Sequence, residues 1–324
     1  MPNIEVRQIT NNHEWDRFVV NSPQYTIFSS SKWASMIEKT TNFKPVFYGC
    51  FSGQEMIAAL LVFYMKKGHF KIGYYPPLTP FITPLFLQSK TSKISKKESY
   101  ETKVVTSFMD KLKKDFFYFI LSLHHSIKDF RSFQHFGLNS KIVYTYLLDL
   151  SNMDEFWKNL GKDVKYDIKK SKERGTEVYI SDNIDRFYNL YEDTCKRQNI
   201  PLIANKQLIQ EMMLIKDSKM FFAKNNEGQD IASSIVIFDH KRAYYLLAAH
   251  DSRYKDHKAS SLLLWEIIKH VSKKRNKMDL VGANTPSVAK FKSSFNPKLV
   301  PYIQAEYYSS FLAKILIGIY RMVR

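Results

Sequence analysis

Apolar and polar residues alternate along two segments that repeat one another at a constant spacing. An aromatic strand start at Phe47 is followed by a polar turn and a second apolar strand near Ile57, and the same order recurs at Phe221 and Ile231. Each copy is typical of a β-hairpin, because short alternating runs around a glycine-containing turn favour two antiparallel strands. The repeat therefore predicts two similar halves in tandem.

Helical periodicity brackets both hairpins, and further strands follow them. The expected helices cover residues 15–20, 33–40, 100–114, 184–199 and 260–275. The further expected strands cover residues 69–75, 242–247 and 279–282. This mixture predicts an α+β protein with domains at 1–150 and 151–306, joined near residues 149–154.

Two segments between these elements have compositions of their own. Residues 76–84 contain four prolines, which removes too many backbone donors for a central strand and predicts a loop over a cleft. Residues 89–99 are polar and rich in lysine, and they are expected to form a mobile connector.

Composition narrows the class of protein. The chain has 324 residues, of which 44% are hydrophobic, so it has enough apolar surface for two folded domains. Its formal net charge of +18 predicts an anionic partner. Two cysteines cannot build a disulfide scaffold, and the first residues lack a secretory pattern, so a cytoplasmic location is expected. The nine histidines show no metal-ligand spacing, and no metal site is predicted.

A lysine-rich segment at residues 157–175 is the clearest electrostatic feature. At about 100° per residue, five lysines fall within one arc of a helix beside an apolar stripe. A phosphate-rich ligand would turn their mutual repulsion into attraction, whereas a solvated face relieved by neighbouring acids is the plain alternative. The five lysines are Lys158, Lys162, Lys165, Lys169 and Lys172.

A single lysine lies between two phenylalanines after the last expected strand. Lys292 is flanked by Phe291 and Phe295. A partly desolvated lysine stabilises an oxyanion or a phosphate far better than one in water. The alternative is a lysine that reaches solvent while both phenylalanines belong to the core.

These segments together resemble a known family. Residues 165–178 are similar to the basic helix-to-strand signature of Fem-type (FemAB-like) peptidyltransferases and their relatives in the GNAT superfamily, with lysines where the family usually has arginines. Four further segments occur along the chain in the same order as in the family: residues 28–33, 76–84, 259–266 and 291–295. The resemblance covers nearly the whole chain.

The resemblance implies two tandem GNAT-like domains, each a mixed, largely antiparallel sheet flanked by helices. It also implies acyl transfer to an amine, from an aminoacyl-tRNA donor to a lipid- or nucleotide-linked cell-envelope precursor of the peptidoglycan-bridge type, without a further cofactor. Lys292 would stabilise the oxyanion, and Asp279 and Tyr244 are candidate bases by position. The expected substrate and phosphate contacts are Lys165, Lys169, Lys172, Phe291, Phe295 and Trp33.

Two other functions remain open. The first is an acyl-CoA-dependent N-acyltransferase that acts on an amino sugar in polysaccharide biosynthesis. It would have the same fold but use a different acyl donor. Residues 251–260 contain no glycine where CoA-dependent GNAT enzymes usually have a glycine-rich pyrophosphate turn. A non-catalytic nucleic-acid-binding protein would use the lysine segment, but the positive charge is spread over both halves.

Residues 307–324 are expected to form an amphipathic helix. An interfacial helix on an anionic membrane surface, and with it a peripheral location, is one interpretation. A helix docked on its own domain is the other. The broad apolar face would hold Phe311, Leu312, Ile315, Leu316, Ile319 and Val323, and Lys314, Arg321 and Arg324 would share the opposite side with Ile317.

Overall fold

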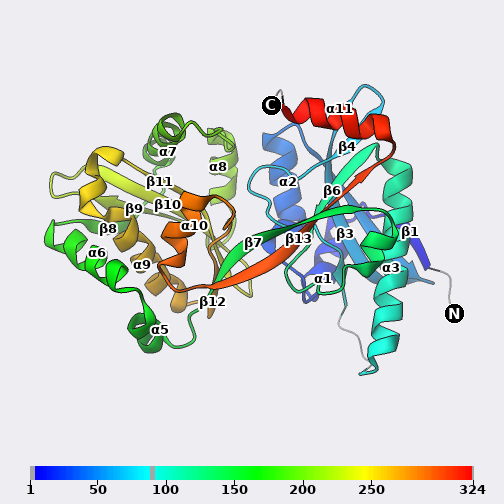
Figure 1. Ribbon diagram of the computed structural model, residues 1–324, viewed down its shortest axis with the longest axis horizontal. Helices are drawn as coiled ribbons and strands as arrows, with labels where there is room; N and C mark the ends of the chain where they lie inside the picture. The colour runs from blue at the N-terminus through cyan, green and yellow to red at the C-terminus, as the bar shows by residue number, and fades with distance from the viewer. Residues whose placement is uncertain (1–3, 88–91, 323–324) are drawn as a thin grey trace. The chain divides into compact units, whose positions relative to one another are not determined.

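The computed structural model describes residues 4–87 and 92–322 and divides into two units (Figure 1). The second unit comprises residues 144–300, and the first combines the residues before and after it. The expected division at residues 150 and 306 differs from this one at both boundaries, because residues 144–150 belong to the second unit and residues 301–306 to the first. Within the described ranges, no helix is long and apolar enough to cross a membrane.

The first unit is built on a sheet with the order β1-β2-β3-β4-β6-β13, and β5 pairs with β3. Only β4 and β6 run parallel among these pairs. The strands are β1 (Ile4–Gln8), β2 (Lys44–Ser52), β3 (Glu55–Lys67), β4 (Phe70–Gly73), β5 (Leu85–Phe86), β6 (Tyr118–Ser122) and β13 (Lys298–Tyr308). The helices are α1 (Asn12–Val19), α2 (Ser31–Thr40), α3 (Ile94–Asp115), α4 (Arg131–His135) and α11 (Phe311–Met322).

The second unit repeats this plan with the order β7-β12-β11-β10-β9-β8. Here only β11 and β12 run parallel among the pairs. The strands are β7 (Asn139–Asp149), β8 (Glu177–Ile180), β9 (Lys219–Lys224), β10 (Asp230–Phe238), β11 (Ala243–His250) and β12 (Lys277–Asp279). The helices are α5 (Met153–Asn159), α6 (Lys162–Glu173), α7 (Ile184–Gln198), α8 (Lys206–Met213), α9 (Ala259–Ser272) and α10 (Pro286–Ser293).

The two sheets exchange their last strands. Strand β7 follows β6 in the chain but pairs with β12 of the second unit through residues 147–149. Strand β13 comes after β12 but pairs with β6 of the first unit through residues 304–308. In each unit, an antiparallel strand from another part of the chain therefore lies next to the parallel pair.

The two predicted hairpins are confirmed as β2–β3 and β9–β10. Residues 76–84 form a loop, which makes a β-bridge between Ile82 and Ser122 of β6 and packs Phe81 against Tyr302 of β13. The connector expected at residues 89–99 is wrong from Ile94 onward, because α3 begins there and its later turns bury Val104 and Phe108 in the core. Residues 88–91 of that connector lie outside the described residues.

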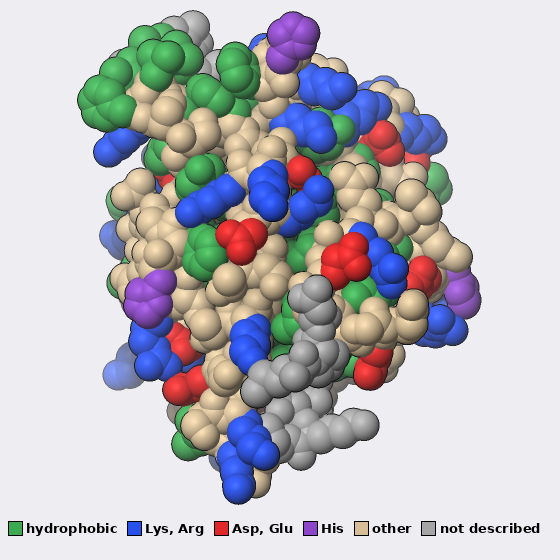
Figure 2. All heavy atoms as spheres, turned by 90° about the vertical axis from the view of Figure 1, so that its right-hand side faces the viewer, with side chains coloured by type: hydrophobic (Ala, Val, Ile, Leu, Met, Phe, Trp, Pro, Cys, Tyr) green, Lys and Arg blue, Asp and Glu red, His purple; other side chains and the backbone are tan. Residues whose placement is uncertain are grey.

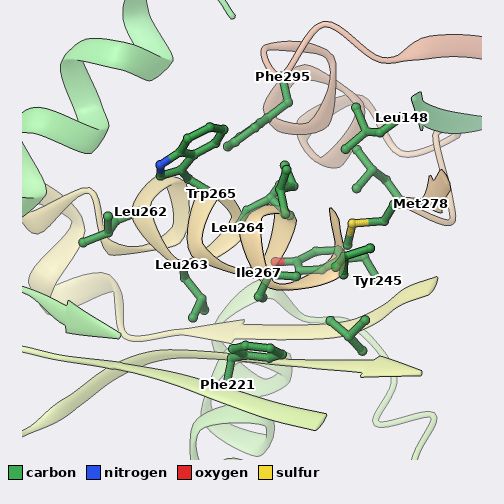
Figure 3. Close-up of a cluster of buried hydrophobic side chains, with 14 of the residues drawn as sticks. Leu148, Phe221, Tyr245, Leu262, Leu263, Leu264, Trp265, Ile267, Met278 and Phe295 are labelled. Carbon is green, nitrogen blue, oxygen red and sulfur yellow. The ribbon is translucent and has the colours of Figure 1, made fainter. Parts of the chain in front are cut away.

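The core of the second unit is organised around α9, which is apolar on nearly every side. Figure 3 shows Leu263 directed toward the strands that carry Phe221, while Trp265 and Phe295 lie on the opposite side of the helix. All four side chains are buried. Because α9 is packed on both sides, it holds the neighbouring ends of β12 and α10 in fixed positions.

Candidate active site

A cavity of about 480 Å³ lies in the second unit, along the part of β11 that does not pair with β12. Strand β12 pairs with β11 only at Ala243 and Tyr244. Beyond that point β11 continues to His250, and the cavity is bordered by its residues 245–250, by the start of α9 and by α10. The separation of two parallel strands thus opens the sheet at this site.

Lys292 on α10 contributes a buried amine to the cavity wall. Its side chain donates hydrogen bonds to the backbone carbonyls of Val281 and Gly282. Burial lowers the pKa of Lys292 to about 8, and the negative charge of Asp279 opposes this shift. The two acceptor residues lie in a turn with positive φ, at 49° for Val281 and 64° for Gly282. This conformation is strained for a β-branched valine.

Asp279, at the end of β12, holds that turn in place. Its Oδ1 accepts a hydrogen bond from Thr145 Oγ1 at 2.5 Å and another from the backbone N–H of Val281 at 2.8 Å. Complete burial raises the pKa of Asp279, while these bonds and the charges of Arg242 and Lys292 oppose the rise. Asp279 lies behind the cavity wall, so its geometry supports a positioning role, and its predicted role as a base stays a prediction.

Tyr244 and Tyr245 point to opposite faces of β11, as neighbours on a strand must. Tyr244 is fully buried, its hydroxyl donates to Asp239 Oδ2 at 2.7 Å, and burial raises its pKa well above the usual value. Tyr245 instead borders the cavity, and its hydroxyl accepts a hydrogen bond from Ser234 Oγ at 2.9 Å. Sequence reasoning named Tyr244 and missed Tyr245, because alternation separates the two faces without showing which one meets the cavity.

The lysine-rich segment differs from the single helix that was expected. It forms α5 and α6, separated at Leu160 and Gly161, so Lys158 lies on a different helix from the other lysines. The break follows from packing: Leu160 is buried, and a Cβ on Gly161 would lie 3.2 Å from the backbone oxygen of Ser294.

None of the three predicted phosphate-binding lysines borders the cavity. Lys169 forms an exposed ion pair with Glu173 at 3.7 Å, and Lys165 Nζ donates to the carbonyl of Lys158 at 2.9 Å. Lys172 is exposed on the same helix. Their contact with a substrate phosphate stays a prediction.

The predicted aromatic residues divide into two groups. Phe291 borders the cavity beside Lys292, whereas Phe295 is fully buried in the core, with its ring centroid 5.7 Å from that of Phe291. Trp33 belongs to the core of the first unit, where its indole Nε1 donates to Thr79 Oγ1 at 2.9 Å. The structure therefore places Lys292 and Phe291 at the cavity, with Asp279 directly behind them.

The start of α9 is also part of the site, and it includes the last two residues of the glycine-free stretch 251–260. Lys258 has φ 55° and precedes the helix without a side-chain cap, and the cavity is bordered by Lys258, Ala259 and Ser260. Free N–H groups at a helix start attract anions. In the described residues, no group of three His, Cys, Asp or Glu side chains is placed to hold a metal ion.

The cavity falls within a stretch that matches a known family model. Residues 158–293 match the model described as "Acetyltransferase (GNAT) domain". The second unit therefore carries a GNAT domain, and the chain is an enzyme of the acyltransferase class. No curated protein matches the sequence.

Solved structures extend the likeness to both units. The crystal structure of FemX superimposes with a TM-score of 0.72 and 13% identity, over 97% of this chain and 99% of that chain. L-PGS from Bacillus licheniformis gives a TM-score of 0.56 and 11% identity, over 95% and 96%. A tandem GNAT protein from the clavulanic acid biosynthesis pathway gives 0.52 and 9%, over 95% and 99%. The chain thus has the fold of two tandem GNAT-like domains, each a mixed sheet flanked by helices, as the resemblance implied.

Proposed function

We propose that this protein transfers an aminoacyl or acyl group to an amine of a bacterial cell-envelope precursor, of the peptidoglycan-bridge type. The observation that carries the proposal is the buried amine of Lys292 in the wall of a 480 Å³ cavity within the GNAT domain. The likeness to FemX supports the class of acceptor. The net charge of +18 suits donors and acceptors that carry several phosphates.

The geometry suits stabilisation of an oxyanion. When an amine attacks an acyl ester or thioester, the carbonyl oxygen becomes negatively charged in the tetrahedral intermediate. The ammonium of Lys292 has three N–H donors, and two of them bind the carbonyls of Val281 and Gly282. The third is available for the oxyanion, in a site where burial strengthens the attraction.

The identity of the donor distinguishes this function from a second candidate function. The start of α9 at the cavity favours a pyrophosphate, because its free N–H groups and Lys258 attract anions there. That observation supports an acyl-CoA-dependent N-acyltransferase of an amino sugar. An aminoacyl-tRNA donor would instead engage Lys165, Lys169 and Lys172 on α6, and either donor is used without a further cofactor. A cytoplasmic location, where both donors occur, is part of the proposal.

The test is a parallel titration at one salt concentration with acetyl-CoA, aminoacyl-tRNA and a nucleotide-linked muropeptide, followed by a transfer assay with the donor that binds. We expect Lys292→Met to lower kcat by at least about 100-fold, as loss of an oxyanion donor does. Lys290→Met, an exposed lysine of the same helix, is the matched control. Retained turnover in Lys292→Met rejects the site, and nucleic-acid binding with steep salt dependence but without transfer to the muropeptide rejects the proposed reaction.

A further inference from the structure

Helix α11 turns its broad apolar face away from the protein. Phe311 is 78% exposed, Leu312 61% and Ile319 55%. With Ile315 and Leu316, also exposed, they cover an arc of about 140° on the helix. The helix expected at residues 307–324 begins at Phe311, because Tyr307 and Tyr308 end β13, and Val323 and Arg324 lie outside the described residues.

A narrow second face holds α11 on the first unit. Ala313 and Ile317 are buried, and Ile317 packs with Ile72 of β4 and with Tyr118 and Ile120 of β6. At the end of the helix, Arg321 forms an ion pair with Glu306 at 3.1 Å. The helix is therefore docked on its own domain, as one interpretation of the sequence expected, yet its larger apolar face stays uncovered.

The surroundings of this face are basic. Residues 311–322 contain no acid; Lys314 is exposed, whereas Arg321 is paired with Glu306 of β13. On the adjacent β4, Phe70 lies on the same side of the strand as Ile72 and is 52% exposed. Figure 2 shows hydrophobic side chains gathered at the top of the molecule, where Figure 1 has α11, with lysine and arginine side chains next to them. In the hairpin that leads into β4, Lys67 pairs with Phe70 and therefore lies on the same side of the sheet.

We propose that α11 docks the protein on an anionic lipid bilayer, with the exposed apolar face inserted at the level of the acyl chains and the neighbouring lysines at the headgroups. An exposed apolar arc with a basic edge is the geometry of an interfacial helix. A second copy is a poorer partner, because it would bring two basic edges together, whereas phosphate headgroups neutralise them. This surface is independent of the cavity and of the transfer reaction.

The experiment is sedimentation of the full chain with vesicles of phosphatidylcholine alone or mixed with phosphatidylglycerol. We expect binding to the mixed vesicles that weakens as salt is added. The double variant Phe311→Ser/Leu312→Ser should bind at least about tenfold more weakly, because two large apolar side chains leave the lipid. The control Ile94→Ser/Leu214→Ser changes side chains that are 74% and 67% exposed elsewhere, and it should bind like the wild type. Lys314→Glu should weaken binding to the mixed vesicles only.

Three results would overturn the proposal. One is no sedimentation of the wild type with phosphatidylglycerol vesicles, and another is equal binding by the α11 double variant and its control. The third is a dimer by light scattering that the double variant converts to a monomer without any vesicle binding, which would assign this face to a second copy. Circular dichroism of each variant checks that the fold is retained, and no substrate is needed for any arm.

Discussion

Replacing Lys292 with methionine removes the free-energy cost of burying a positive charge at this position. A lysine whose pKa falls from 10.5 to about 8 on folding carries a penalty of about 3 kcal/mol in its charged form. Methionine is of similar length and has no charge, so the penalty disappears. It also leaves the carbonyls of Val281 and Gly282 without this donor, at a cost that does not depend on pH.

The pH dependence separates the two effects. Below pH 8 the folded and unfolded wild type both hold the Lys292 proton, and the penalty is present in full. Between about pH 8 and 10.5 the unfolded chain binds more protons than the folded one, so wild-type stability rises with pH. Relative to Lys292→Met, the wild type should therefore gain about 2.5 kcal/mol between pH 7 and pH 10.

Urea unfolding at both pH values measures this gain. Tryptophan fluorescence reports it, since Trp157 and Trp265 lie in the second unit. Other lysines and tyrosines titrate equally in both proteins and cancel in the difference. If the stability difference between wild type and Lys292→Met is the same at pH 7 and pH 10, within about 0.5 kcal/mol, the charge of Lys292 is not desolvated as described.

Three further substitutions test the packing that holds the site and the fold, each by the shift in urea midpoint. Thr145→Val removes the 2.5 Å hydrogen bond to the buried Asp279 and should destabilise by about 2 kcal/mol; an unchanged midpoint would mean that the bond does not matter. Gly73→Ala places a Cβ 2.8 Å from that of Phe119 and should cost about 2 kcal/mol, with a wild-type midpoint as the contrary result. Asn199 follows α7 with a left-handed φ of 50°, which glycine adopts without strain, so Asn199→Gly should stabilise the protein by about 0.5 kcal/mol. A lower urea midpoint would contradict this expectation.

Local patterns predicted the elements well because their causes are local. The repeated alternation at Phe47 and Phe221 identified both hairpins, and apolar periodicity placed the ends of α7 within one residue and those of α9 within three residues of the observed ones. The pairing of residues 304–308 with β6 was not predictable. Alternation shows that a segment is a strand but not which strand lies beside it, and β6 lies far earlier in the chain.

The site was predictable only in part for a related reason. Lys292 between two aromatic residues is a visible signal, and it borders the cavity. The turn at Val281 that orients Lys292 has no sequence signature, since a β-branched residue is the least expected at positive φ. Similarly, the helix break at Gly161 depends on a close approach to Ser294 that only the folded chain reveals.

The exchange of β7 and β13 sets an order for folding. The second unit is a continuous segment, residues 144–300, so its contacts form without waiting for the rest of the chain. The first unit is interrupted by that whole segment, and β6 has no β13 beside it until residues 304–308 arrive. Closing so long a loop is entropically costly and slow, and a compact, already folded insert shortens the effective distance. We therefore expect the second unit to fold first, and a newly made chain to expose the edge of β6 until its last strand is added.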